Sequence, residues 1–132
     1  MKDLLWSQTL SVEVKEVDDD HRRLVDLFNM LNHAVNDGSD ARYIGIVMEE
    51  LVNCTAWHFS HEERLMLEHG YPGLEAHRQE HLDLMDTVRD LQREILRTGR
   101  LEEAEFEVLE QWLTGHILAD DMKFGEFLLA TA

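Results

Sequence analysis

The sequence predicts an all-α protein, an up-down-up-down antiparallel bundle of four helices that follows an irregular N-terminal arm. Three observations favour this fold. The 132 residues suit one domain, 44% of them are hydrophobic, and only one proline and seven glycines interrupt the chain. Apolar residues also recur every three or four positions in four successive segments, which is typical of helices with one buried face. Since no linker or low-complexity segment divides the chain, we expect a single domain over 1–132.

The first two predicted elements are the arm and a helix. Residues 1–16 show no helical period and form the arm, and the bundle is expected over about 18–128. The three consecutive aspartates at 18–20 carry side chains that can cap a helix N-terminus. Apolar positions follow at helical steps from Leu24, and Gly38 is expected to end this helix.

Three further helices are predicted by the same period. The second begins beyond Ser39 and ends at Gly70. The third opens on two histidines four residues apart and ends at Thr98, and the fourth runs from about Glu102 toward Leu128. Because the connections are short, neighbouring helices are expected to be antiparallel.

Charge and cysteine content exclude several classes of partner and compartment. The chain has 28 acidic and 12 basic residues, a formal net charge of -16, which repels nucleic acid phosphates and anionic lipids. No window reaches the roughly 18 apolar residues of a membrane-spanning helix, so membrane insertion is not expected. The single Cys54 cannot form an internal disulfide, and MKDLLWSQTL lacks the apolar stretch of a secretory signal. We therefore expect a cytoplasmic, monomeric protein.

Five of the eight histidines fall where the helical period calls for buried apolar residues. One buried histidine usually only bonds a nearby carboxylate or backbone group, but five such histidines on four helices indicate a shared site. His58 lies four residues before Glu62, which places both side chains on one helix face, and a second pair has the same spacing. A metal could bind either pair. The five histidines are His21, His58, His77, His81 and His116.

Buried carboxylates would complete such a site, because an anion inside a bundle is costly unless a cation compensates it. The candidates are Glu62, Asp120 and Asp121, and the four-residue spacing from His116 favours Asp120. One zinc takes about four ligands, so this donor set implies two metals. Two octahedral ions offer about twelve positions; five histidines, two bridging carboxylates and one bridging oxo or hydroxo group leave one open. That opening favours binding of one small molecule.

Five ordered motifs from Trp6 to about Leu128 resemble the bacteriohemerythrin family. The resemblance implies a four-helix bundle that holds two non-haem irons, binds dioxygen reversibly and is not an enzyme. The preference for iron over manganese follows from this resemblance, because histidine-rich octahedral sites accept several metals. The motifs are SVEV at Ser11, VDDDHRRL ending in Leu24, HFSHEERLM from His58, YPGLEAHRQEH from Tyr71 and WLTGHILADD from Trp112.

The resemblance also implies a role for each site residue. The implied ligands are His77, His81 and His116 on one iron, His21 and His58 on the other, and Glu62 and Asp121 as bridges. Dioxygen would bind the two-histidine iron in an apolar pocket formed by Phe59, Leu113 and Ile117. Since the family pattern selects Asp121 and helical spacing selects Asp120, we infer a local distortion of the fourth helix.

Some residues depart from the family pattern or lie outside the ligand set. Glutamine is more common than Asp20, glycine often replaces Glu13, and tyrosine often replaces Phe124. His61, three residues after His58, could be a partner of a ligand. These positions concern the surroundings of the irons and leave the ligands intact.

The leading interpretation is an oxygen carrier, store or supplier to an oxygen-consuming enzyme. One alternative is a diiron oxidase, peroxidase or nitric oxide scavenger, although no additional inward acid or base supports turnover. A second is an oxygen or iron sensor that acts with a separate partner, since the chain has no length for a fused signalling module. A third is iron storage or a bundle that a metal merely stabilises.

Overall fold

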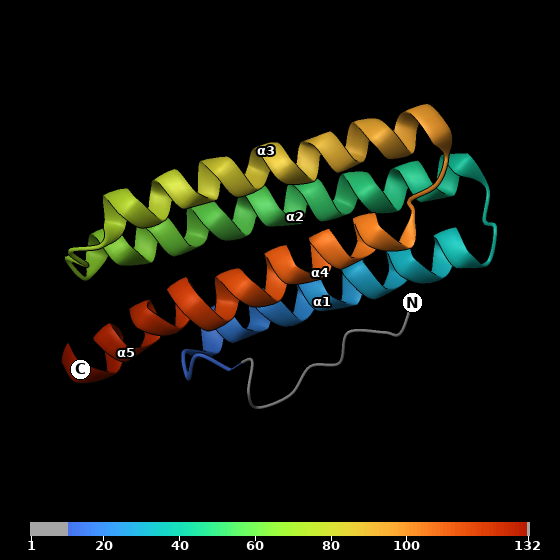
Figure 1. Cartoon of the computed structure of the whole chain (residues 1–132). Coiled ribbons are helices and arrows are strands. Elements are labelled where there is room, and N and C mark those ends of the chain that lie inside the picture. Colours follow the sequence, from blue (N-terminus) through green and yellow to red (C-terminus); the bar gives the residue numbers. More distant parts are fainter. Residues whose placement is uncertain (1–10, 132) are drawn as a thin grey trace.

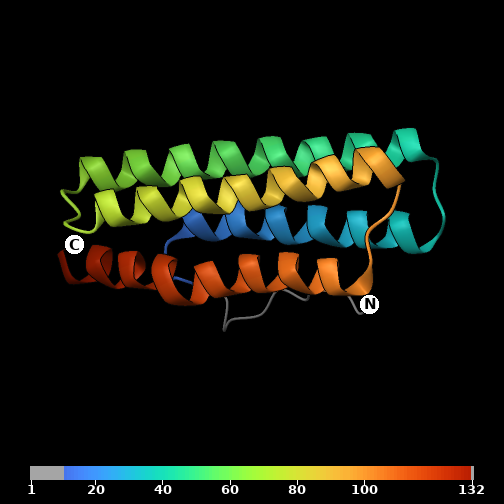
Figure 2. The same cartoon turned by 45° about the horizontal axis from the view of Figure 1, so that its top comes forward.

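The computed structural model describes residues 11–131, which form four antiparallel helical rods (Figures 1 and 2). The predicted all-α bundle is confirmed, and the described part contains no strand. The fourth rod consists of three consecutive helical segments. The elements are α1 (Lys15–Asn36), α2 (Ala41–Glu68), α3 (Leu74–Thr98), α4 (Glu103–His116), the π-helix η2 (Ile117–Asp121) and α5 (Met122–Thr131).

The first helix begins earlier than the sequence predicted. Helix α1 starts at Lys15 and Val14 is its N-cap, so the expectation that the aspartates at 18–20 cap the helix is wrong. Asp18 instead accepts hydrogen bonds from the backbone N–H of Val12 at 2.8 Å and the hydroxyl of Ser11 at 2.6 Å. This carboxylate therefore holds Ser11 and Val12 against the first turns of α1. Of the predicted arm, residues 1–10, including Trp6, lie outside the described residues.

Glu13 makes the sharp bend between that segment and α1. Its φ of 61° lies in the left-handed region, which glycine adopts most readily. This conformation explains why glycine suits the position. The ends of α1 and α2 follow the sequence prediction, since Gly38 and Gly70 both have positive φ and lie two residues after the last residue of each helix.

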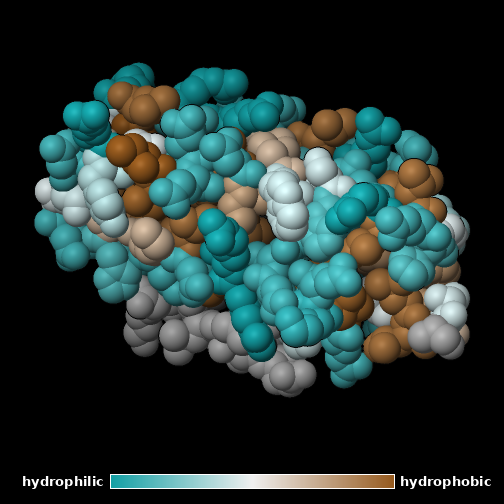
Figure 3. All heavy atoms as spheres, turned by 180° about the vertical axis from the view of Figure 1, so that it is seen from behind, coloured by the Kyte–Doolittle hydropathy of each residue, from teal (hydrophilic) through white to brown (hydrophobic). Residues whose placement is uncertain are grey.

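Apolar side chains from all four rods form one core. On the face seen from behind, hydrophilic residues cover most of the visible surface and hydrophobic residues form separate patches (Figure 3). No helix in the described part of the chain combines the length and apolar character needed to cross a membrane.

The segment before α1 packs against α5 at Gly125. Val12 is buried in the core, and a Cβ on Gly125 would overlap the carbonyl oxygen of Val12. We expect Gly125→Ala to lower the free energy of unfolding by about 1–3 kcal/mol, because the backbone must shift to admit the methyl group. Urea unfolding followed by circular dichroism measures the change.

Gly45→Ala is the matched control, because this glycine lies inside α2 and its new methyl group would make only ordinary contacts. It should raise the free energy of unfolding by about 0.5–1 kcal/mol. Equal stability of the Gly125 variant and the native chain would contradict the close packing at α5.

Candidate metal centre

All four rods contribute predicted ligands to one buried region of the bundle. None of the seven side chains is more than 6% exposed, and both carboxylates are fully buried. The helical period therefore placed every one of the five histidines inside, as expected. The seven are His21 on α1, His58 and Glu62 on α2, His77 and His81 on α3, His116 on α4 and Asp121 at the end of η2.

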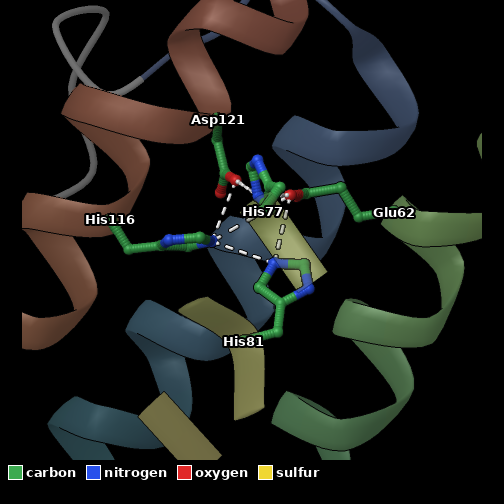
Figure 4. Close-up of side chains that lie close together, drawn as sticks. All are labelled: Glu62, His77, His81, His116 and Asp121. Carbon is green, nitrogen blue, oxygen red and sulfur yellow. Dashed lines mark hydrogen bonds and ion pairs between the residues drawn. The ribbon is translucent and has the colours of Figure 1, made fainter. Parts of the chain in front are cut away.

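One group combines three histidines with both carboxylates, and Figure 4 shows these side chains pointing toward one another. Nε2 of His77 lies 2.6 Å from Oε1 of Glu62 and 3.0 Å from Oδ1 of Asp121. Nε2 of His116 lies 3.0 Å from the same Asp121 oxygen and 3.1 Å from Nε2 of His81. All five ligand atoms lie within 4.8 Å of one another, which is close enough to hold one cation.

A second group combines His21 and His58 with the remaining oxygens of the same carboxylates. Nε2 of His58 lies 3.1 Å from Oε2 of Glu62, and Nε2 of His21 lies 2.8 Å from Oδ2 of Asp121. The two Nε2 atoms are 3.1 Å apart. Each carboxylate thus turns one oxygen toward each group of histidines, which is the arrangement of carboxylates that bridge two metal ions.

A π-helical turn between His116 and Asp121 brings these two residues to the same side of the helix. In an α-helix the fourth residue along faces the same way, but the wider turn of η2 adds one residue. The predicted distortion is therefore present. Asp120, which the four-residue spacing favoured, lies on the outer side, with 26% of its side chain exposed and Oδ2 3.7 Å from Nδ1 of His116.

The carboxylates carry charge in this buried region because histidines face them. Burial opposes the charged form of His77, but contacts with Asp121 and Glu62 outweigh it and raise the pKa of His77 to about 10. The same balance raises the pKa of His116 to about 9. Burial and Asp121 favour neutral Glu62, yet contacts with two histidines lower its pKa to about 2. Without a metal, protons on imidazoles balance the two carboxylates.

The donor set fits two cations. None of the four oxygens of Glu62 and Asp121 accepts a hydrogen bond of normal geometry from a described residue, although imidazole nitrogens lie close by. Buried polar atoms without partners are costly, and metal ions bound between these atoms would satisfy them. The two groups would offer three nitrogens and two oxygens to one ion, and two nitrogens and two oxygens to the other.

An outer layer of carboxylates orients three of the histidine rings. Asp20 accepts from Nδ1 of His58 at 3.0 Å, and two glutamates accept from His81 and His116 in the same way. His61 also donates to Asp20, at 2.6 Å, so it contacts a carboxylate that itself bonds the predicted ligand His58. Such bonds fix the ring orientation and raise the basicity of a ligating imidazole. The glutamates are Glu63, 2.8 Å from His81, and Glu80, 3.0 Å from His116.

Sequence reasoning missed this layer, although the chain carries a signal for it. Each outer carboxylate is next in sequence to a predicted ligand on its own helix, and it bonds a ligand on the following helix. Asp20 precedes His21 on α1 and bonds His58 on α2. A search for acids adjacent to the predicted ligands would have found all three.

Removing the Asp20 carboxylate should weaken metal binding. We expect Asp20→Ala to lower the affinity for Fe²⁺ by about 10- to 100-fold, because the His58 ring loses the bond that orients it. Anaerobic competition with a coloured chelator measures the affinity. Asp19→Ala is the control, since Asp19 is half-exposed and pairs only with Lys15 in the described structure. Equal losses in both variants would rule out an orienting role for Asp20.

The three predicted pocket residues lie together beside the second group of histidines. Phe59, Leu113 and Ile117 are buried and border a small cavity of about 10 Å³, whose wall also includes His21 and His58. A cavity of this size holds about one water-sized molecule. The described wall is otherwise apolar apart from His116 and the indole of Trp112.

Comparison with known proteins finds a matching family model, similar sequences and similar solved structures. The family model described as the hemerythrin HHE cation binding domain matches residues 12–128. A bacteriohemerythrin of Stenotrophomonas maltophilia is 29% identical over 93% of this chain and 80% of its own length, and one of Pseudomonas paraeruginosa is 31% identical over 92% and 78%. A crystal structure of wild-type hemerythrin superposes with a TM-score of 0.83 at 27% identity, covering 93% of this chain and 95% of that one.

Proposed function

Since the chain belongs to the hemerythrin family, whose HHE cation-binding domain matches residues 12–128, we propose that it binds dioxygen reversibly at a centre of two non-haem irons. The observation that carries this proposal is the orientation of the carboxylates. Glu62 and Asp121 each present one oxygen to either group of buried histidines. His77, His81 and His116 would hold one iron, and His21 and His58 the other. Ferrous irons would supply the electrons on which reversible binding of dioxygen depends.

The cavity beside His21 and His58 supports binding at the two-histidine iron. Its size admits one small molecule, and the apolar side chains of Phe59, Leu113 and Ile117 line it. Exclusion of water suppresses hydrolysis and proton leakage at a reactive centre. The described cavity wall contains no carboxylate, and each of its imidazoles belongs to a predicted metal ligand. We therefore propose a binding protein and not an enzyme.

The wider role follows from this chemistry as part of the same proposal. A protein that binds and releases dioxygen can carry or store it, or deliver it to an oxygen-consuming enzyme. We propose this role for a monomeric, single-domain protein in the cytoplasm. Absence of a described membrane-crossing helix is compatible with it.

Visible spectroscopy of the iron-loaded, anaerobically reduced protein tests the proposal. With two irons per chain, an absorption band should appear on exposure to air and fade on purging with argon, over repeated cycles. Irreversible oxidation without such a band, or steady consumption of reductant and oxygen, would favour a diiron oxidase. Many more than two irons per chain would favour iron storage.

Enlarging the cavity should shorten the life of the oxygen-loaded state. We expect Leu113→Ala to speed irreversible loss of the oxygen-induced band several-fold, because the shortened side chain leaves room for water next to His21 and His58. The decay of the band in air-saturated buffer measures this rate. Leu109→Ala is the control, since Leu109 is equally buried but does not border the cavity. Equal decay in both variants would argue against the cavity as the oxygen site.

A further inference from the structure

The buried centre requires a route by which metal ions reach it. Its seven predicted ligands are almost completely enclosed, so an ion must pass between helices. A surface pocket of about 160 Å³ between α3 and the start of α5 lies next to the centre. Its polar lining consists of Tyr71, His77, Glu80, Asp120 and Lys123.

Two carboxylates of this pocket converge on one imidazole nitrogen, Nδ1 of His116. Glu80 from α3 and Asp120 from η2 are partly exposed, at 35% and 26% of their side chains. Their oxygens lie 3.0 and 3.7 Å from Nδ1 of His116, and the three ligand atoms lie within 4.8 Å of one another. The opposite nitrogen of that ring, Nε2, lies 3.0 Å from Asp121 in the buried centre. His116 therefore contacts the pocket carboxylates on one side and the centre on the other.

A second imidazole joins the pocket to the centre independently of the carboxylates. The His77 side chain is 4% exposed and forms part of the pocket wall, and its Nε2 lies 2.6 Å from Glu62. Neither ring nitrogen of His77 makes a hydrogen bond of normal geometry within residues 11–131. A buried imidazole without such a partner can exchange its proton for a cation that arrives in the pocket.

We propose that Glu80 and Asp120 form a loading site that captures a divalent cation from solvent and transfers it past His77 and His116 to the buried centre. This inference rests on the proposed two-metal centre. Carboxylate oxygens are effective ligands for hydrated divalent cations, and a pair of them at a pocket mouth raises the local cation concentration. Lys123 is the one lysine or arginine in the described pocket lining, and its charge opposes cation capture.

Stopped-flow uptake of Co²⁺ by the metal-free protein tests the loading site, because bound cobalt absorbs visible light. The slope of the observed rate against Co²⁺ concentration gives the association rate constant. We expect Glu80→Gln and Asp120→Asn to lower this constant about tenfold, since each removes one capturing charge. At saturating Co²⁺ both variants should still bind two ions per chain at the end of the reaction, because the seven predicted ligands are unchanged.

Glu63→Gln is the matched control. Glu63 bonds Nδ1 of His81 as Glu80 bonds Nδ1 of His116, but it lies outside this pocket. Its association rate constant should therefore stay native even if its final affinity falls, whereas a general loss of ring orientation would lower that constant as much as Glu80→Gln does. Lys123→Gln should change the rate in the opposite direction, with loading about twofold faster. Circular dichroism before mixing establishes that each variant is folded.

Three results would overturn the loading site. They are native rates in both the Glu80 and Asp120 variants, equal slowing in the Glu63 control, and slower loading in the Lys123 variant. Failure of the native chain to take up two ions would contradict the two-metal centre itself. A native chain that binds two ions while its Glu80 and Asp120 variants load at the native rate would contradict only the loading route.

Discussion

Asp121→Ala is expected to abolish the two-metal centre, lowering metal affinity by more than about 100-fold. This loss exceeds the 10- to 100-fold cost typical of an outer partner of a ligand, because Asp121 faces both groups of histidines directly. Its removal would take one oxygen from each ion and leave Glu62 as the one fully buried carboxylate among the described residues. Iron analysis after anaerobic loading and gel filtration measures the effect.

Asp120→Ala is the control for this experiment, since the two aspartates are adjacent and only Asp121 faces inward. After equilibration overnight the Asp120 variant should retain two irons per chain. Asp121→Asn, which keeps the side-chain volume, separates loss of coordination from loss of folding. Two irons per chain in the Asp121→Ala protein would show that the bridging assignment is wrong.

Loading of both metals should raise the melting temperature by at least about 10 °C. The seven predicted ligands come from all four rods, so bound ions would connect every helix of the bundle. A ligand at a thousandfold excess over its dissociation constant contributes about 4 kcal/mol per site. In a domain of this size each kcal/mol shifts the melting temperature by a few degrees.

Differential scanning calorimetry of loaded and chelator-treated protein measures this shift. Asp121→Asn provides the comparison, because added metal should hardly change its melting temperature. Equal melting temperatures with and without metal in the native chain would mean that the ions do not bind between the helices.

Helical periodicity was sufficient to predict the bundle and the inward direction of the histidines. His58 and Glu62, four residues apart in α2, share a helix face because the α-helix is regular there. The start of α1 could not be predicted in this way. Asp18 bonds residues that precede the helix, and this contact depends on a bend at Glu13 that no period reveals.

The position of Asp121 shows a second limit of spacing arguments. A regular helix places Asp120 beside His116, and only the π-helical turn reverses that choice. The outer carboxylates are a third case, because Asp20 and its two counterparts bond rings on a neighbouring helix. Such pairings depend on how the helices pack, so a single helix face cannot predict them. The ligand roles themselves stay predictions until metal binding is measured.

The π-helical turn also determines which way the side chains of the following helix, α5, point around the helix axis. One additional residue advances the helix by about 100° of rotation. The π-helical turn therefore sets both the inward direction of Asp121 and the direction of the α5 face that contacts Val12. Deleting a single residue between 117 and 120 would rotate Phe124 and Gly125 away from the core together with the loss of Asp121. A one-residue deletion here would thus affect the centre and the far end of the bundle at once.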